Sequence, residues 1–311
     1  MSDVIRFEDV HRHFGRHAVL RGLTFEVRRG EIYAFLGRNG AGKTTALRIL
    51  LGLLAPHGGR SEILGVDSTQ LQPAHRARIG YVGEGHRLYP AMRVSDAIAF
   101  EAETRSTLDR GFVARAVQRC GLRPAQVVAR LSRGERAQLS LILAAAGRPD
   151  VLVFDDPAMG LDVVMRRSLL DAMIDLLAGF GCTVLFSSHI LTDVERIADR
   201  VGILHEGTML VDATLDDLKR RVARWPWQPA NGATPPVEAR VLRATRRHDG
   251  FALTLVDADA ALLERLRAHG RLGEPATPDL EELFLDLTGP ERNGLLSESL
   301  AARAERDEVT P

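Results

Sequence analysis

Hydrophobic and polar positions in the first third of the chain follow two different periods. Residues 23–27 alternate between apolar and polar types, which predicts a strand with one buried face. Residues 32–36 are all apolar and end at Gly37, as is typical of a strand buried on both faces. From Lys43, apolar residues recur at helical spacing as far as Leu54, before a proline and two glycines. The predicted order is strand, glycine-rich loop, helix.

Later segments continue this alternation of strands and helices. Residues 86–147 have mainly helical spacing, and apolar runs typical of buried strands return at 151–154, 183–186 and 201–204. Strands that alternate with helices indicate a parallel α/β sheet. The helical block at 86–147 is then expected to be an insertion on that sheet.

A change in composition at Arg224 suggests a second domain. Residues 223–236 contain both tryptophans and several prolines, which favours a turn-rich linker. A hairpin is predicted over 237–256, followed by helices near 258–269 and from Asp279 to Gly289. We therefore expect a C-terminal accessory domain at 237–290, and a polar, disordered tail at 291–311.

Overall composition is that of an ordinary globular protein. Lys+Arg and Asp+Glu both number 41 in the 311 residues, so charge gives no reason to expect a nucleic-acid partner. The two cysteines favour neither a disulfide framework nor a metal cluster. The first ten residues do not resemble a secretory signal, and no apolar run approaches the length that spans a bilayer. Any membrane role is expected to depend on a partner.

The glycine-rich loop carries the strongest chemical signal. Residues 37–44 read GRNGAGKT and fit the phosphate-loop pattern between a strand and a helix. Glycines let backbone N–H groups converge on phosphate oxygens at the positive end of a helix. Lys43 is expected to reach the β- and γ-phosphates, and Thr44 to provide a ligand to Mg²⁺.

A second motif provides carboxylates. Residues 151–154 form an apolar run that ends at Asp155 and Asp156. In a phosphate-loop fold this is the place of the aspartate that holds Mg²⁺. Asp155 is the candidate for that role, and Asp156 could polarise the attacking water.

Four further motifs appear in a fixed order, and with them the chain resembles an ABC ATPase. Residues 131–135 (LSRGE) resemble the signature motif LSGGQ, and residues 160–162 (GLD) resemble the D-loop. Ser188 precedes His189, which resembles the switch histidine, and Phe14 stands where an aromatic residue stacks on adenine. The resemblance extends from about residue 5 to 221.

The resemblance implies a P-loop NTPase of the α/β class. Its RecA-like core would carry N-terminal antiparallel strands and an inserted helical subdomain, all within residues 1–222, followed by a small α+β appendage. Two ATP molecules with Mg²⁺ would be sandwiched in a head-to-tail dimer. The residues expected to bind ATP are Phe14, Gly37, Asn39, Gly40, Ala41, Gly42, Lys43, Thr44 and Thr45, with Ser132 and Gly134 supplied by the other subunit.

The same resemblance assigns the metal and the chemistry. Thr44, Asp155 and Glu84 are expected to hold Mg²⁺, and Asp156, His189 and Glu84 to serve hydrolysis. Residues 85–92 and the segment 279–289 resemble ATPases paired with ABC-2-type permeases, which are often exporters. A separate permease chain would then hold this subunit at the cytoplasmic face of the membrane.

Several positions depart from the family pattern. Asp156 stands in place of glutamate, Glu84 in place of glutamine, and Arg133 in place of a signature glycine. One interpretation is slow hydrolysis through Asp156. The other is a weakened site, either in the degenerate half of a heterodimer or in a regulatory nucleotide switch. DNA-repair ATPases are disfavoured, because the short spacing from Lys43 to Ser132 leaves no room for a coiled coil.

Overall fold

The computed structural model describes residues 3–105, 107–230, 232–236 and 240–289. The predicted disordered tail at 291–311 lies outside the described residues. The chain divides into two compact units, Met1–Ala198 with Glu206–Thr208, and Asp199–His205 with Met209–Pro311. The sequence-based boundaries at 222 and 237 stay a prediction.

An antiparallel sheet opens the first unit. Its strand order is β2-β1-β4-β5, from β1 (Asp3–Phe14), β2 (His17–Arg28), β4 (Gly58–Ile63) and β5 (Val66–Asp67). Phe7 and Phe25 face each other across β1 and β2, and their ring centroids are 4.6 Å apart. The N-terminal antiparallel strands that the family resemblance implied are confirmed.

Parallel strands form the centre of this unit. They lie in the order β3-β8-β7-β6, from β3 (Ile32–Leu36), β8 (Thr183–Ser188), β7 (Val151–Asp155) and β6 (Ile79–Val82). Every residue of β3, β7 and β8 is buried, which explains their uninterrupted apolar runs. Because the strands are parallel, their carboxyl ends meet at one edge of the sheet, where a phosphate-loop fold binds its ligand.

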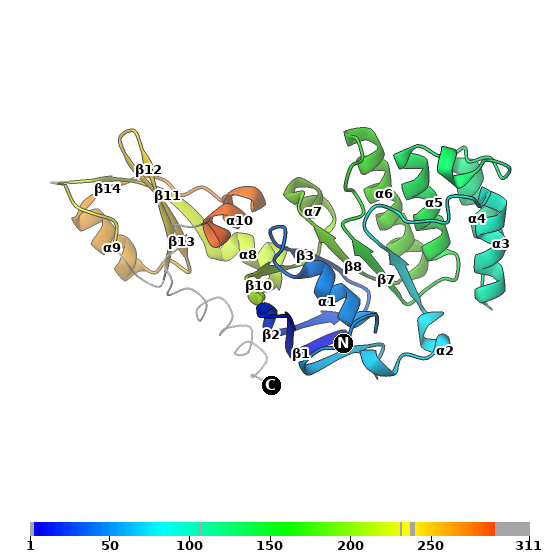
Figure 1. Ribbon diagram of the computed structural model, residues 1–311. Coiled ribbons are helices and arrows are strands. Elements are labelled where there is room, and N and C mark those ends of the chain that lie inside the picture. Colours follow the sequence, from blue (N-terminus) through cyan, green and yellow to red (C-terminus); the bar gives the residue numbers. More distant parts are fainter. Residues whose placement is uncertain (1–2, 106, 231, 237–239, 290–311) are drawn as a thin grey trace. The chain divides into compact units, whose positions relative to one another are not determined.

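Helices cover this sheet and form the predicted insertion. The core carries α1 (Lys43–Leu50), α2 (Pro73–Arg76), α6 (Val163–Phe180) and α7 (Leu191–Ile197), with a short 3₁₀ turn at Ser68–Gln70. The inserted layer consists of α3 (Val94–Thr104), α4 (Arg110–Arg119), the 3₁₀ turn Val128–Arg130 and α5 (Arg133–Ala145). Figure 1 shows α3, α4 and α5 gathered together, and they share a core that includes Val94, Val113 and Leu139.

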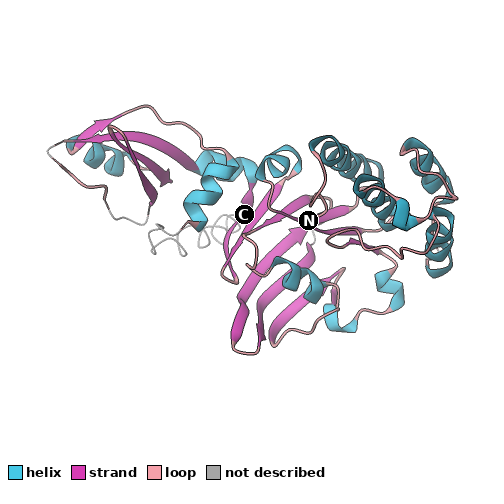
Figure 2. Cartoon of the chain, turned by 45° about the horizontal axis from the view of Figure 1, so that its top comes forward, coloured by secondary structure: helices cyan, strands magenta, loops and turns pink. Residues whose placement is uncertain are grey.

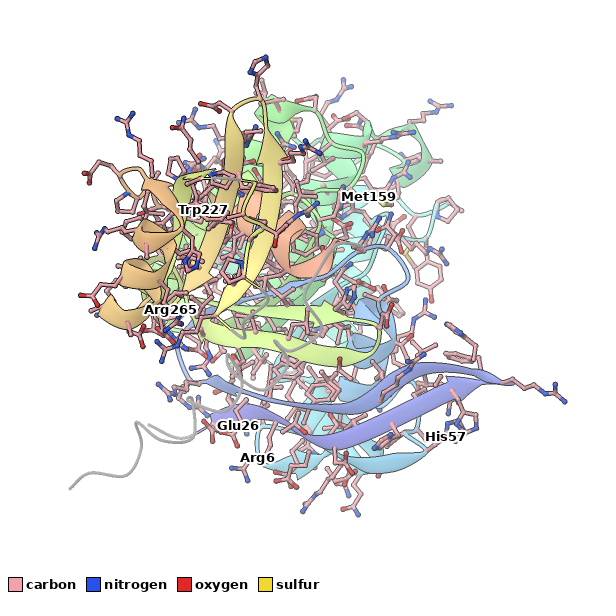
Figure 3. All side chains as sticks on the ribbon, turned by 90° about the vertical axis from the view of Figure 1, so that its left-hand side faces the viewer. Arg6, Glu26, His57, Met159, Trp227 and Arg265 are labelled. Atoms are coloured by element: carbon pink, nitrogen blue, oxygen red, sulfur yellow. The ribbon has the colours of Figure 1, made fainter. Side chains whose placement is uncertain are left out.

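A third sheet dominates the other unit (Figure 2). Its order is β12-β13-β11-β14, and it follows β9, β10 and α8 in the chain. Trp227 is buried in its core, and its indole N–H donates to the carbonyl of Leu266 on α9 at 2.9 Å. Figure 3 labels Trp227 together with Arg265 of α9. The elements are β9 (Arg200–His205), β10 (Thr208–Thr214), α8 (Leu215–Arg221), β11 (Val222–Pro229), β12 (Val241–Arg247), β13 (Gly250–Val256), α9 (Ala260–Ala268), β14 (Gly270–Leu272) and α10 (Leu280–Thr288).

Strand β11 replaces much of the turn-rich segment predicted at 223–236. It pairs with β13 from Val222 to Trp227 and with β14 from Trp227 to Pro229. Pro226 cannot donate to a neighbouring strand, but its carbonyl accepts the N–H of Gly273 at 2.8 Å. The local proline signal favours turns, whereas burial of Trp227 and pairing with distant strands favour the extended conformation.

A buried ionic cluster fixes α10 to this sheet. Arg224 of β11 pairs with both Glu282 and Asp286 of α10, and its Nη2 atom lies 2.7 Å from Asp286. Thr254 of β13 donates its hydroxyl to the same Asp286 carboxylate at 2.5 Å. Asp286 is only 4% exposed, and Arg243 also lies near its carboxylate at 3.8 Å, so its buried charge is compensated by several neighbours. The helix predicted from Asp279 is present, and the side chain of Asp279 caps it by accepting the N–H of Glu282.

None of the helices in the described part of the chain is long and apolar enough to cross a membrane.

Candidate nucleotide site

A cavity of about 570 Å³ lies at the carboxyl edge of the parallel sheet. Loops after β3, β6, β7 and β8 contribute to it, together with the start of β2. Phosphate-loop folds bind nucleotides at this edge. The lining residues are His17, Val19, Asn39, Gly40, Gly42, Lys43, Thr44, Thr45, Glu84, Asp155, Asp156, Met159, Ser187 and His189.

The glycine-rich loop has a backbone that other residues would strain. Gly40 and Gly42 have φ angles of 82° and 113°, in the region that glycine adopts without steric cost. A Cβ atom on Gly42 would lie 2.8 Å from a methyl carbon of Leu20 and 3.0 Å from the carbonyl oxygen of Val19. Gly37 and Ala41 shape the loop, although neither lines the cavity. Helix α1 begins at Lys43, directly after Gly42, so the positive end of the helix dipole faces the cavity.

Lys43 is the cation of the site. Its ammonium group donates to the carbonyl oxygen of Gly37 at 2.6 Å. Burial lowers the pKa of Lys43, while the negative charges of Asp156, Asp155 and Glu84 oppose that shift. Lys43 and these three carboxylates line the same cavity, so the ammonium is placed to attract a phosphate.

Thr44 and Asp155 are connected directly. The Thr44 hydroxyl donates to Oδ1 of Asp155 at 3.0 Å, and the Ser187 hydroxyl donates to the same oxygen at 3.1 Å. Ser187 also accepts the backbone N–H of Asp156 at 2.9 Å. This network holds the ends of α1, β7 and β8 together. It places a hydroxyl and a carboxylate side by side on the cavity wall.

Asp156 lies against His189. The Oδ2 atom of Asp156 is 2.6 Å from Nδ1 of the imidazole. Its Oδ1 atom is buried and has no hydrogen-bond partner within the described residues. Burial raises the pKa of the Asp156 carboxyl, an effect that His189 only partly offsets. Asp156 adopts a left-handed backbone conformation, with φ 48°, which aspartate tolerates better than most residues.

Of the remaining predicted site residues, some line the cavity and Phe14 does not. Glu84 is exposed on the turn after β6 and lines the cavity, as do Asn39 and Thr45. Phe14 does not line it, because the Phe14 side chain is exposed and stacks under the guanidinium of Arg12 at 4.9 Å. The role of Phe14 in stacking on adenine stays a prediction.

The signature turn lies apart from this cavity. Ser132 caps α5, and it forms reciprocal hydrogen bonds with Glu135 at 2.7 Å and 3.2 Å. The backbone N–H of Ser132 holds the pKa of Glu135 below its usual value. A Cβ on Gly134 would lie 2.5 Å from the end of the Met165 side chain, so only glycine fits easily. Neither Ser132 nor Gly134 lines the cavity of its own chain.

Sequence reasoning missed several lining residues. His17 and Val19 come from β2. Met159, which is labelled in Figure 3, comes from the loop after β7. Ser187 precedes the Ser188-His189 pair, and this run of polar residues at the end of an apolar strand was the available signal. The β2 residues carry no comparable signal, because the strand register alone brings them to the site.

The residues on the cavity wall fit a divalent cation with oxygen ligands. Mg²⁺ is usually bound by one or two protein oxygens, and phosphate and water supply the rest. The Thr44 hydroxyl and the Asp155 carboxylate provide such a pair. Within the described ranges, no group of three acidic, histidine or cysteine side chains could hold a metal alone. The fit is thus to a metal that arrives with a phosphate ligand.

Comparisons with known proteins agree with this geometry. A family model described as ABC transporter matches residues 20–159. The bacitracin transport ATP-binding protein BcrA of Bacillus licheniformis is 32% identical over 223 residues, covering 71% of this chain and 73% of BcrA. The Nod factor export ATP-binding protein I of Burkholderia lata is 32% identical over 302 residues, covering 92% and 97% of the two chains.

Solved structures show the same similarity. The ATP-binding subunit of an ABC transporter superimposes with a TM-score of 0.64 at 29% identity, covering 70% of this chain and 92% of that one. A dimeric ATP-binding cassette bound to ADP and Pi superimposes with a TM-score of 0.61 at 20% identity, covering 68% and 98%. The second similarity concerns the fold alone.

Proposed function

Because this chain belongs to the family of ATP-binding subunits of ABC transporters, and is therefore an ATPase, we propose that it dimerises head to tail around two Mg-ATP molecules and drives a separate membrane permease. One observation carries the proposal. The cavity holds the phosphate loop and both carboxylates, whereas Ser132 and Gly134 lie elsewhere on the chain. A second subunit is needed to bring a signature turn to the nucleotide.

The phosphate loop would bind the triphosphate. Backbone N–H groups of the loop and the start of α1 would face the β- and γ-phosphates, and Lys43 would neutralise their charge. Thr44 and Asp155 would hold Mg²⁺, with Glu84 near enough to share in that role. Bound Mg²⁺ supplies charge stabilisation to the transferred phosphoryl group.

Asp156 and His189 would act on the attacking water. The Asp156 carboxylate would accept a proton from water, while its Oδ2 atom remains in contact with the imidazole. Burial favours the protonated form of this carboxyl, which suits a group that must hold a proton transiently. His189 would orient the carboxylate and, through its exposed edge, reach the γ-phosphate.

A surface beside the site suits the permease. Residues 81–83, 86–89 and 92, with residues of α3 and α5, line a depression of about 210 Å³. Tyr89 is 64% exposed at its rim and makes an edge contact with Phe100 at 6.0 Å. Exposed aromatic rings that flank a hollow are typical of protein interfaces. We assign this face to the permease and place the subunit at the cytoplasmic side of the membrane.

Export is the direction that the relatives favour. One is a Nod factor export protein, another is a bacitracin transport protein, and a third is the daunorubicin resistance protein DrrA3 of Streptomyces coeruleorubidus, 30% identical over 317 residues. The alignment with DrrA3 covers 98% of DrrA3 and 94% of this chain, so the similarity includes the C-terminal unit.

The alternative assigns this chain a weakened site in a heterodimer or a regulatory switch. It rests on Asp156 in the place of glutamate. The direct contact between Asp156 and His189 favours hydrolysis by this chain instead.

Sedimentation of the full chain with and without a non-hydrolysable ATP analogue and Mg²⁺ tests the dimer. We expect monomers without nucleotide and dimers with it. A chain that stays monomeric at millimolar nucleotide would contradict the homodimer and favour the heterodimer. Co-purification from membranes with an integral membrane protein tests the permease assignment.

A further inference from the structure

A second cavity, larger than the nucleotide cavity, lies among the helices of the first unit. Its volume is about 670 Å³, compared with about 570 Å³ at the phosphate loop, and no residue lines both cavities. Residues of α4, α5 and α6 line it, and Figure 1 shows α5 between the other two helices. This α4–α6 cavity has a size that is typical of small-molecule sites.

The lining of the α4–α6 cavity is mainly apolar. Leu141 and Ile142 of α5 and Leu169 of α6 are buried, and Ala116 of α4 is partly buried. Gln138 of α5 also lines the cavity, and its amide forms no hydrogen bond within the described ranges. Small-molecule sites usually combine such apolar walls with a few polar groups that orient the ligand. The interior therefore suits a ligand with an apolar body.

Charged side chains lie at the exposed rim of this cavity, with arginines on α4 and aspartates on α6. Asp171 of α6 accepts a hydrogen bond from Arg196 at 2.5 Å, so its charge is already compensated. Arg119 of α4 lies 3.6 Å from Asp175 of α6, and both side chains are mostly exposed. An exposed ion pair of this kind contributes little to stability. Each aspartate nevertheless has an arginine partner, so neither attracts a cationic ligand strongly.

Arg115 is the charged group of the rim without an ion-pair partner. It is exposed on α4, and it forms no hydrogen bond or ion pair with any residue that the structure describes. The charge of Asp109, at the start of α4, also acts on Arg115, but that carboxylate is bound by Arg148 at 2.6 Å. A guanidinium can hold a carboxylate through two parallel hydrogen bonds. An anion at this rim would therefore gain the charge of Arg115 without breaking an existing ion pair.

We propose that the α4–α6 cavity binds an amphipathic organic anion, whose apolar body lies against Leu141 and Leu169 and whose carboxylate pairs with Arg115. This inference goes beyond ATP hydrolysis and does not depend on the proposed dimer. A cationic head group would be repelled by Arg115 and Arg119, while the aspartates opposite already have partners. A neutral amphiphile would gain only apolar burial. The sign of the head group therefore distinguishes this site from a general apolar surface.

Cys120 reports on occupancy of the cavity in the full chain. Its half-buried thiol lines the cavity, whereas Cys182 is only 1% exposed and lies elsewhere. The rate of Cys120 alkylation by iodoacetamide is measured with decanoate and with decyltrimethylammonium, which have similar chains and opposite head charges. We expect decanoate to bind with a dissociation constant of about 1 mM, as its size allows, and to slow alkylation about tenfold at about ten times that concentration. The ammonium should slow alkylation by less than about twofold.

Two pairs of variants on α4 give matched controls. Arg115→Glu should weaken decanoate binding by about tenfold and favour the ammonium, because the charge at the rim is reversed. Arg110→Glu, at an exposed position that does not line the cavity, should behave as wild type does. Ala116→Trp should fill the cavity and abolish protection by decanoate, whereas Ala114→Trp, at an exposed position outside the lining, should keep it. Melting temperatures show which variants fold, and the exposed Arg115→Glu decides the question if Ala116→Trp does not fold.

Three results would overturn the anion site. The first is Cys120 alkylation that decanoate does not slow. The second is protection that is equal for the two amphiphiles or unchanged by Arg115→Glu, since either result would indicate an apolar surface without selectivity. The third is alkylation that slows as the protein concentration rises without any amphiphile, because a second copy of the chain would then cover the cavity.

Discussion

The Nδ1 atom of His189 lies 2.6 Å from the Oδ2 atom of Asp156. This contact joins the end of β8 to the end of β7, and the other carboxylate oxygen of Asp156 is buried without a hydrogen-bond partner in the described chain. A carboxylate that is oriented on one side and free on the other is arranged for proton transfer. The shorter side chain of aspartate, compared with glutamate, is thus partly compensated by its position.

Substitutions at Asp156 should separate these effects. Asp156→Asn removes the proton acceptor and should lower ATP turnover by about 100-fold or more. Asp156→Glu should raise turnover, because it restores the reach of the family's usual residue. Steady-state phosphate release measures both. The exposed Asp171 of α6 gives a control, since Asp171→Asn should leave turnover unchanged. Equal rates for wild type and Asp156→Asn would favour the weakened-site alternative.

The raised pKa of Asp156 predicts a pH effect on stability. Its folded-state pKa lies above the ordinary value of 3.8, so the folded chain binds this proton more tightly than the unfolded chain does. The stabilisation is present below pH 3.8 and is lost as the pH rises through the folded-state pKa. Asp156→Asn should therefore melt at a higher temperature than wild type at neutral pH, without nucleotide. The difference should shrink as the pH falls toward 4, and scanning calorimetry across that range measures it.

The raised pKa of Asp156 also predicts how ATP hydrolysis falls at acid pH. The carboxylate form of Asp156 is the proton acceptor, so kcat/KM should fall on the acid side at a pH above 3.8. Phosphate release between pH 5 and 8 in constant ionic strength measures this limb. The residual activity of Asp156→Asn should not show this fall toward acid pH. A limb that remains in that variant would assign the titration to another group.

Thr44 provides a test of the metal site. Its hydroxyl donates to Asp155, and it would exchange that hydrogen bond for a bond to Mg²⁺. Thr44→Val should raise the Mg²⁺ concentration for half-maximal hydrolysis by about tenfold or more. Thr44→Ser keeps the hydroxyl and should restore the wild-type requirement. Titration of Mg²⁺ at fixed ATP distinguishes the two, and chelation with EDTA should stop hydrolysis in all variants.

The ionic cluster of the second unit predicts a local stability effect. Asp286→Ala would leave Arg224 partly uncompensated and should lower the free energy of unfolding of this unit by about 3 kcal/mol. Both tryptophans of the chain, Trp225 and Trp227, lie in β11, so tryptophan fluorescence during urea unfolding reports on this unit. Asp249→Ala, at an exposed turn, should change stability by less than about 0.5 kcal/mol.

Sequence and structure agree best where local chemistry determines the backbone. The loop at 37–44 could be predicted because phosphate binding requires glycine at positions such as Gly40 and Gly42, whose φ angles are positive. The apolar runs of β3, β7 and β8 predicted a buried parallel sheet because both faces of each strand are covered. Both signals are contained within a few neighbouring residues.

Features set by distant contacts could not be predicted in this way. Strand β11 depends on β13 and β14, which lie 20 to 50 residues later in the chain. The position of Phe14 depends on Arg12 stacking against it, and the entry of Val19 into the cavity wall depends on the register of β2. No periodicity in the sequence records such pairings, so the lining of the cavity was identified only in part.

The reciprocal hydrogen bonds between Ser132 and Glu135 have a consequence for how the proposed dimer would form and separate. The turn is rigid in the isolated subunit, so closing the dimer costs little ordering of the chain at this point. The Ser132 oxygen accepts the N–H of Glu135, which leaves the hydroxyl hydrogen free to be donated outward. In the proposed dimer, the two surfaces would then be joined through the bound nucleotide, and cleavage of its terminal phosphate would part them without refolding of this turn.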